Sequence, residues 1–192
     1  ECTREICIGE ILQVGNAGNL ELTLQQYQEI IHRKTAILYG LSCKLGSMLS
    51  GATSEQVAAL ESFGNRMGEA FQIIDDSLDL VGDPEVVGKS LGTDLANGKL
   101  TLPLLLLRDS LEGAEREQLM QLLADCYQSE ASESSRVEMA TLLANHGIMQ
   151  RVRGRAKDAI ESALSDLRGA APESPARQRL EDRAEYIIQR EL

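Results

Sequence analysis

Three aspartates lie close together in FQIIDDSLDL, residues 71–80, inside a long apolar pattern that contains no basic residue. Asp75 and Asp79 are four residues apart, so on a helix both point to one side, with Asp76 beside them. Carboxylates this close repel one another unless a cation compensates. Mg²⁺ suits them better than zinc or calcium, because it takes one or two carboxylates and completes its shell with water and phosphate oxygens. The pattern predicts a Mg²⁺ site, with a solvated helix edge as the alternative.

Three lysines accompany the aspartates. Lys34 lies in an apolar stripe, where a buried ammonium needs an anion; a side chain that snorkels to the surface is the alternative. Lys89 and Lys99 follow the aspartates in the glycine-rich stretches GKSLGTD and NGKLTLP. A divalent ion surrounded by ammonium groups is typical of sites that hold a diphosphate and stabilise the charge of its departure. The alternative for the last two is a loop with solvated lysines.

Helices are expected to position these side chains, because apolar residues recur at steps of three and four in two long segments. Each segment follows a capping box, Thr23-x-x-Gln26 or Thr53-x-x-Gln56. The predicted buried stripes are Tyr27, Ile31, Lys34, Leu38, Leu41, Leu45 and Met48 in the first helix, and Val57, Leu60, Gly64, Met67, Phe71, Ile74, Leu78 and Val81 in the second. Shorter helices are expected around Pro103 and at 115–126, 137–146, 148–167 and 176–190, with a loop at 82–99 and a Ser/Glu linker at 129–135. No alternating strand pattern competes, so the predicted fold class is an all-α helical bundle.

A second stripe on the later helix begins with Gly64 and Gly68 and continues to Gln72, Asp75 and Asp79. Glycine in a helix costs about 1 kcal/mol relative to alanine. The two glycines therefore indicate that something bulky approaches this face.

Composition excludes several classes of partner. The chain has 192 residues, enough for one ordinary domain, and a formal net charge of -11. That charge argues against binding to nucleic acid or to an anionic membrane surface. Four cysteines form no CxxC pair, and the longest apolar run, residues 102–107, is too short to cross a bilayer. We therefore expect a cytoplasmic protein with reduced thiols.

The motifs, taken in order, resemble those of the trans-isoprenyl diphosphate synthases. FQIIDDSLDL with GDP, GKSLGTD and NGKLTLP is similar to their second aspartate-rich region, and HRKTAILYGLSCKLG to their Lys-Thr helix; GEILQ and LEDRAEYIIQREL also fit. The resemblance implies an isoprenoid synthase fold in which Mg²⁺ ionises an allylic diphosphate, isopentenyl diphosphate attacks the cation, and a proton is lost. It further implies roles for eight positions: Asp75 as metal ligand, supported by Asp76 and Asp79; Lys34, Lys89 and Lys99 as ligands of the allylic diphosphate; Thr35 and Gln72 lining the same pocket. Lys34 and Asp75 would be the catalytic residues.

One part of the family pattern is missing. Its members carry a first aspartate-rich motif on an earlier helix, preceded by basic residues that bind isopentenyl diphosphate, whereas Asp75-Asp76 is the only Asp-Asp pair here. We expect residues 1–192 to be the C-terminal portion of a single prenyl synthase domain that lacks its N-terminal helices and is inactive alone. A polyprenyl synthase of medium- or long-chain type, working as a homodimer, is the favoured interpretation. A noncatalytic or regulatory subunit, or an inactive fragment, is the alternative, and an unrelated helical interaction module is a distant third.

Overall fold

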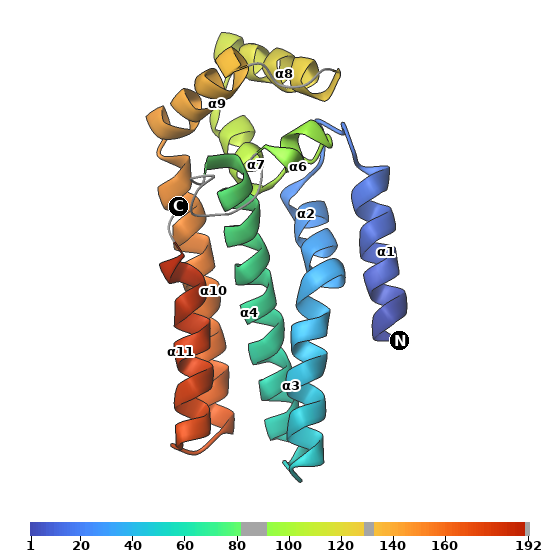
Figure 1. Cartoon of the computed structure of the whole chain (residues 1–192), viewed down its shortest axis with the longest axis vertical. Coiled ribbons are helices and arrows are strands. Elements are labelled where there is room, and N and C mark those ends of the chain that lie inside the picture. Colours follow the sequence, from blue (N-terminus) through green and yellow to red (C-terminus); the bar gives the residue numbers. More distant parts are fainter. Residues whose placement is uncertain (82–91, 129–132, 191–192) are drawn as a thin grey trace.

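The computed structural model describes residues 1–81, 92–128 and 133–190, and all regular structure in them is helical. Long helices stand side by side, and the short helices α6 to α9 cover one end of them (Figure 1). The helices are α1 (Cys2–Gly15), α2 (Leu24–Ile31), the π-helical turn (His32–Ala36), α3 (Ile37–Leu49), α4 (Ser54–Val81), α6 (Thr93–Ala96), α7 (Leu102–Ser110), α8 (Gly113–Gln128), α9 (Glu133–Asn145), α10 (Ile148–Ala170) and α11 (Pro175–Gln189). The predicted all-α fold class is confirmed.

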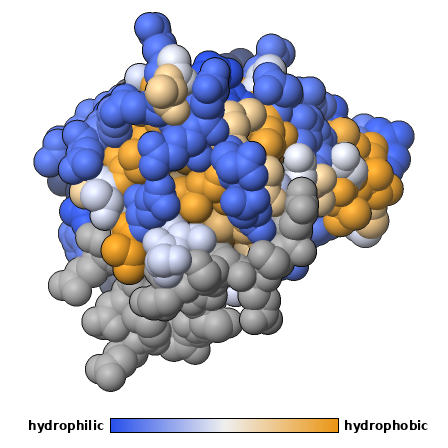
Figure 2. All heavy atoms as spheres, turned by 90° about the horizontal axis from the view of Figure 1, so that it is seen from above, coloured by the Kyte–Doolittle hydropathy of each residue, from blue (hydrophilic) through white to orange (hydrophobic). Residues whose placement is uncertain are grey.

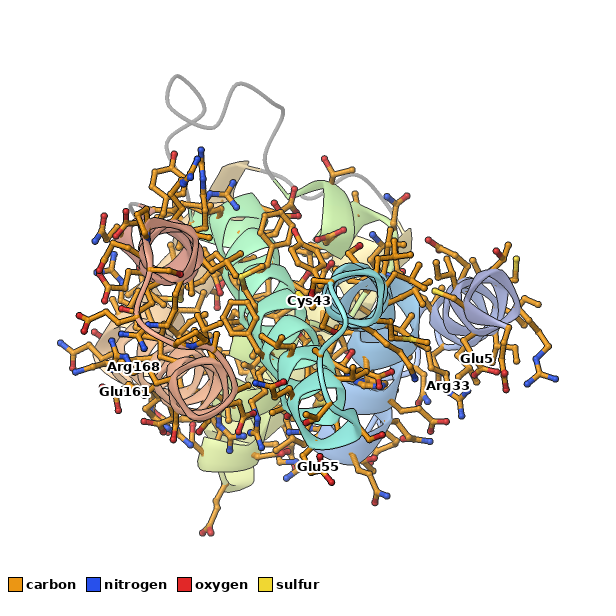
Figure 3. The ribbon with its side chains drawn as sticks, turned by 90° about the horizontal axis from the view of Figure 1, so that it is seen from below. Glu5, Arg33, Cys43, Glu55, Glu161 and Arg168 are labelled. Carbon is orange, nitrogen blue, oxygen red and sulfur yellow. The ribbon has the colours of Figure 1, made fainter. Side chains whose placement is uncertain are left out.

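Helix α4 is the centre of the bundle. It packs against α3 on one side and α10 on the other, with α11 beside α10 and α1 at the outer edge (Figure 3). Phe63 and Ile74 of α4 are fully buried, together with leucines of α7 and Ile148, Val152 and Ile160 of α10. This core holds α4 rigidly along its length, and the three aspartates lie near its C-terminal end.

The helix predicted over residues 27–48 exists, but the π-helical turn His32–Ala36 interrupts it. A π-turn inserts an extra residue and so changes the face that the following residues present. The predicted stripe is therefore wrong beyond the turn: Leu38 is 51% exposed, Leu45 48% and Met48 55%. The small residues Ala36, Gly40 and Ser47 are buried instead.

The bulky group that approaches Gly64 and Gly68 is the neighbouring backbone. A methyl group at Gly64 would lie 2.5 Å from the Tyr39 carbonyl oxygen, and one at Gly68 would lie 2.7 Å from the Ala36 Cα atom. Such distances are too short for a real contact. The glycines therefore allow α4 to pack closely against the π-turn and α3, which fixes the place of Lys34 and Thr35 relative to the aspartates.

The helix starts agree well with the sequence, and the loops less so. Both capping boxes are formed, with Thr23 and Thr53 each bonded to the glutamine three residues later. The loop predicted at 82–99 contains α6, and its first ten residues, 82–91, lie outside the described residues. Likewise, α9 begins at Glu133 within the predicted linker, of which residues 129–132 are not described.

Helix α1 lies at the edge of the bundle and buries only Gly9 among its residues. Glu5 of α1 and Arg33 of the π-turn point toward one another and form an ion pair (Figure 3). Apolar side chains gather at the side of the molecule where α1 lies (Figure 2), and Ile11 and Val14 are the exposed apolar residues of this helix. Among the described residues, no helix combines the length and apolar character needed to cross a membrane.

Candidate functional site

Asp76 is the hub of a buried hydrogen-bond chain. The Tyr27 hydroxyl donates to its Oδ2 atom over 2.6 Å, and Gln72 Nε2 donates to Oδ1 over 2.7 Å. Thr35 Oγ1 in turn donates to Gln72 Oε1 over 2.7 Å. These hydrogen bonds link α2, the π-turn and α4. They also hold together Thr35 and Gln72, which are two predicted pocket residues.

Burial controls the protonation of this hub. Asp76 is only 6% exposed. Burial raises the pKa of Asp76 to about 7, against the lowering effect of the hydrogen bonds from Tyr27 and Gln72. Burial, and then the charge of Asp76, raise the pKa of Tyr27 well above its ordinary value. The phenol therefore keeps its proton and remains a donor at physiological pH.

Asp79 is buried and directed toward the segment that precedes α7. The Asp94 backbone N–H donates to Asp79 Oδ2 over 2.8 Å. Lys99 Nζ donates to Asp94 Oδ1 over 2.5 Å. Burial lowers the pKa of Lys99, but the hydrogen bond and charge of Asp94, with Asp76 and Asp79 further away, raise it more, so Lys99 stays protonated. Lys99 therefore pairs with Asp94 and lines the same cavity as Asp76.

Asp75 lies on a different side of α4 from Asp76. Its Oδ1 atom is 3.9 Å from an Arg190 guanidinium nitrogen, and about a third of its side chain is exposed. The same guanidinium lies over the Phe71 ring, 5.5 Å from its centroid, and Phe71 contacts Tyr39. Asp75 is thus the most accessible of the three carboxylates, with a cation beside it.

Lys34 has the anion that its position required. Its Nζ atom lies 2.6 Å from Gln13 Oε1 and 3.2 Å from Glu10 Oε1, both on α1, and its side chain is 27% exposed. The ammonium is neither fully buried nor free in solvent. A methyl group at Gly9 would lie 2.6 Å from the Lys34 backbone nitrogen, so glycine at this position lets α1 rest directly on the π-turn.

Two neighbouring cavities are lined by four of the eight predicted site residues. A small cavity of about 30 Å³ is lined by Lys34, Gln72, Asp76 and Lys99, together with Tyr27 and Gln13. A wider one of about 280 Å³ is lined by Glu10, Gln13, Lys34 and Lys99. The two lysines therefore face the same space from two sides, although they are 65 residues apart in the chain. Lys89 lies outside the described residues.

The residues fit a magnesium ion in donor type but form no cage. Among residues 1–81, 92–128 and 133–190, no group of three His, Cys, Asp or Glu side chains could hold a metal. Asp76 is committed to Tyr27 and Gln72, and Asp79 to Asp94, whereas Asp75 is accessible. Mg²⁺ needs only one or two carboxylates beside water and phosphate oxygens. Asp75 could therefore hold such an ion, with Asp76 and Asp79 behind it.

Sequence reasoning missed Tyr27, Glu10, Gln13 and Asp94 as site residues. Tyr27 was assigned to the apolar stripe, although its place seven residues before Lys34 puts both on one helix face and marks it as a candidate. Asp94 is the last residue of GKSLGTD, a stretch already singled out for Lys89. No local signal pointed to Glu10 and Gln13, because their contact with Lys34 depends on how α1 docks.

Comparison with known proteins gives a consistent set of relatives. The sequence model described as polyprenyl synthetase matches residues 1–142. A short chain isoprenyl diphosphate synthase of Methanothermobacter thermautotrophicus is 33% identical over 97% of this chain and 56% of its own length. The heptaprenyl diphosphate synthase component 2 of Bacillus subtilis is 36% identical over 81% of this chain and 48% of its own length.

The same likeness extends to three dimensions. A polyprenyl synthase from Caulobacter crescentus, solved in complex with calcium and isoprenyl diphosphate, matches with a TM-score of 0.85 and 32% identity, over 98% of this chain and 56% of that one. The fold is that of the all-α isoprenoid synthases. The chain spans about half the length of the relatives it matches.

Proposed function

Because the chain belongs to the polyprenyl synthetase family, we propose that it takes part in condensing isopentenyl diphosphate with an allylic diphosphate to give a polyprenyl diphosphate. In this prenyl transfer the bond between the allylic carbon and the diphosphate oxygen breaks, the isopentenyl double bond attacks the allylic carbon, and a proton leaves. A medium or long product, a homodimer and a cytoplasmic location stay predictions from the sequence.

The observation that carries the proposal is the convergence of Lys34 and Lys99 on the cavities beside Gln72 and Asp76. Two ammonium groups facing one polar space are suited to a diphosphate, whose oxygens accept several charge-assisted hydrogen bonds. Thr35 and Gln72 would orient the group, and Lys89 would add a third charge. The net charge of the whole chain is negative and repels a diphosphate. The attraction must therefore come from the lysines beside the cavities.

A divalent metal fits the same proposal. Asp75 would hold the ion, and Asp76 and Asp79 would support it through direct or water-mediated contacts. The relative from Caulobacter crescentus was solved with calcium and isoprenyl diphosphate. When bound, Mg²⁺ would neutralise the diphosphate and stabilise the charge that develops as it leaves. The chain's own part is to place Lys34 and Lys99 around the leaving group, whereas Asp75 lines neither of their cavities and would hold the ion from a different side of α4.

The proposal is tested in the intact enzyme by incorporation of labelled isopentenyl diphosphate into an allylic primer with Mg²⁺, comparing the wild type with Asp75→Ala. Asp182→Ala is the matched control, because Asp182 is an exposed aspartate of α11. We expect Asp75→Ala to abolish incorporation without unfolding the bundle, since it removes one of several repelling carboxylates. If Asp75→Ala incorporated as much label as the wild type, the assignment of Asp75 as a metal ligand would be wrong.

A noncatalytic or regulatory subunit is the second candidate, because a relative is one component of a synthase. The relative from Bacillus subtilis is described as component 2 of its synthase, and the present chain covers about half of that protein. In this case the chain alone would incorporate no label, and addition of the component that completes the enzyme would restore incorporation. The aspartates and lysines argue for a direct role even then, because holding several carboxylates together carries an electrostatic cost that a scaffold does not need.

A further inference from the structure

The side chain of Tyr27, on α2, reaches Asp76 of α4. It is 4% exposed, and its hydroxyl lies 2.6 Å from Asp76 Oδ2, although the two residues are 49 positions apart. The same ring lines the small cavity with Lys34, Gln72 and Lys99. A tyrosine hydroxyl that is buried usually finds a hydrogen-bond partner, and here the partner is a carboxylate of the candidate site.

The hydrogen bonds leave Asp76 little freedom. Tyr27 holds one carboxylate oxygen and Gln72 holds the other, so the plane of the carboxylate is fixed from two sides. Gln72 is fixed in turn, because its Oε1 atom accepts from Thr35 and its Nε2 atom is committed to Asp76. Without the Tyr27 hydroxyl, Asp76 could rotate and release Gln72.

We propose that Tyr27 is a positioning residue of the diphosphate site, which acts by holding Asp76 and, through Gln72, Thr35 in the orientation that receives a metal-bound allylic diphosphate. The inference rests on the proposed function and adds a residue to it. Partners that orient the groups around a metal typically account for 10- to 100-fold in metal affinity or activity. If the Tyr27 hydroxyl had only a structural role in the core, its removal would not change the Mg²⁺ dependence of ligand binding.

The chain offers a matched control. Tyr127 is also a partly buried tyrosine, and its hydroxyl has no hydrogen-bond partner within the described parts of the chain. Tyr127→Phe therefore removes the same atom from a tyrosine that lines neither cavity. Any general effect of losing a buried phenolic hydroxyl appears in both variants, and only an effect on the site appears in Tyr27→Phe alone.

The test is a calorimetric titration of the wild type and both variants with a thio-analogue of an allylic diphosphate that does not ionise, at a series of Mg²⁺ concentrations. We expect Tyr27→Phe to weaken Mg²⁺-dependent binding by about 10- to 100-fold, with unchanged affinity in EDTA, and Tyr127→Phe to bind like the wild type. Equal Mg²⁺ dependence in all three proteins would overturn the positioning role while leaving the proposed function intact. A wild type that binds no analogue at any Mg²⁺ concentration would remove the proposed function and this inference with it.

A measurement on the wild type keeps the inference testable if Tyr27→Phe does not fold. With tyrosine labelled by ¹³C at the ring carbon that bears the hydroxyl, the Tyr27 signal should shift when Mg²⁺ and the analogue are added together, and the Tyr127 signal should not. A Tyr27 signal that stays in place at saturation would contradict the positioning role.

Discussion

Gly68 of α4 lies directly against Ala36 of the π-turn, so closely that a methyl group at Gly68 would be 2.7 Å from the Ala36 Cα atom. Because the obstacle is backbone, Gly68→Ala cannot be relieved by a rotamer change. We expect it to lower the free energy of unfolding by about 1–3 kcal/mol, the usual cost of overpacking, as measured by urea denaturation. Gly154→Ala is the control: Gly154 has nothing within 4 Å, so alanine there should stabilise α10 by up to about 1 kcal/mol. Equal effects of the two substitutions would contradict the close packing.

Lys34 is held by Glu10 and Gln13, which a diphosphate would have to displace. We expect Lys34→Ala to weaken allylic diphosphate binding on the order of 10- to 100-fold, the range for a hydrogen bond to a charged group. Glu10→Gln should strengthen it by up to about fivefold, because a competing carboxylate is lost. Lys44→Ala serves as control, since Lys44 pairs with Glu61 elsewhere on α3 and α4. Fluorescence competition measures all three, and unchanged affinity for Lys34→Ala would return this lysine to a structural role.

His32 begins the π-turn and pairs with Glu69, with 2.9 Å between Nδ1 and Oε1. The hydrogen bond that His32 donates to Glu69 raises the pKa of His32 above its ordinary value, against the lowering effects of burial and of Arg33. A raised pKa means that the pair stabilises the fold below the unfolded pKa of about 6.5 and loses this contribution as pH rises through the folded pKa. Thermal denaturation should therefore show His32→Gln less stable than the wild type at pH 5.5 by about 0.2–1 kcal/mol, given the partial exposure, and nearly equal at pH 9. A difference that grows with pH would contradict this.

Asp76 changes stability in the same direction with pH, but over a lower pH range. Its pKa of about 7 lies above the unfolded value of 3.8, so the unfolded chain loses its proton first and stability falls between these two pH values. Asp76→Asn removes this term. From pH 4 to pH 8, Asp76→Asn should therefore gain stability relative to the wild type. The difference between their free energies of unfolding should change by about 4 kcal/mol at most. A difference independent of pH would show that Asp76 titrates normally in the folded protein.

Local signals predicted much of the fold. Each capping box needs only two residues three positions apart, and both Thr23–Gln26 and Thr53–Gln56 formed as expected. The spacing of Asp75 and Asp79 likewise placed both on the long helix α4. Where a structure is decided within one turn of helix, the sequence alone is sufficient.

Features that depend on how helices meet were harder to predict. The helix propensities of residues 32–36 do not predict the π-turn at His32–Ala36. The turn exposes Leu38 and Met48 and buries small residues in their place. Gly64 and Gly68 were recognised as sites of close approach, but only the packing identified the neighbouring backbone. The bond between Tyr27 and Asp76 joins positions 49 residues apart, so it follows from the docking of α2 on α4.

The most direct test of the central claim is a calorimetric titration of the wild-type protein. Farnesyl diphosphate is titrated in Mg²⁺ and in EDTA, and farnesol is titrated in place of the diphosphate. If Lys34, Lys99 and the aspartates form a metal-dependent diphosphate site, farnesyl diphosphate will bind in Mg²⁺ and weaken strongly in EDTA, and farnesol will not compete. Binding of farnesol as tight as that of farnesyl diphosphate, or no binding of the diphosphate in Mg²⁺, would contradict the account.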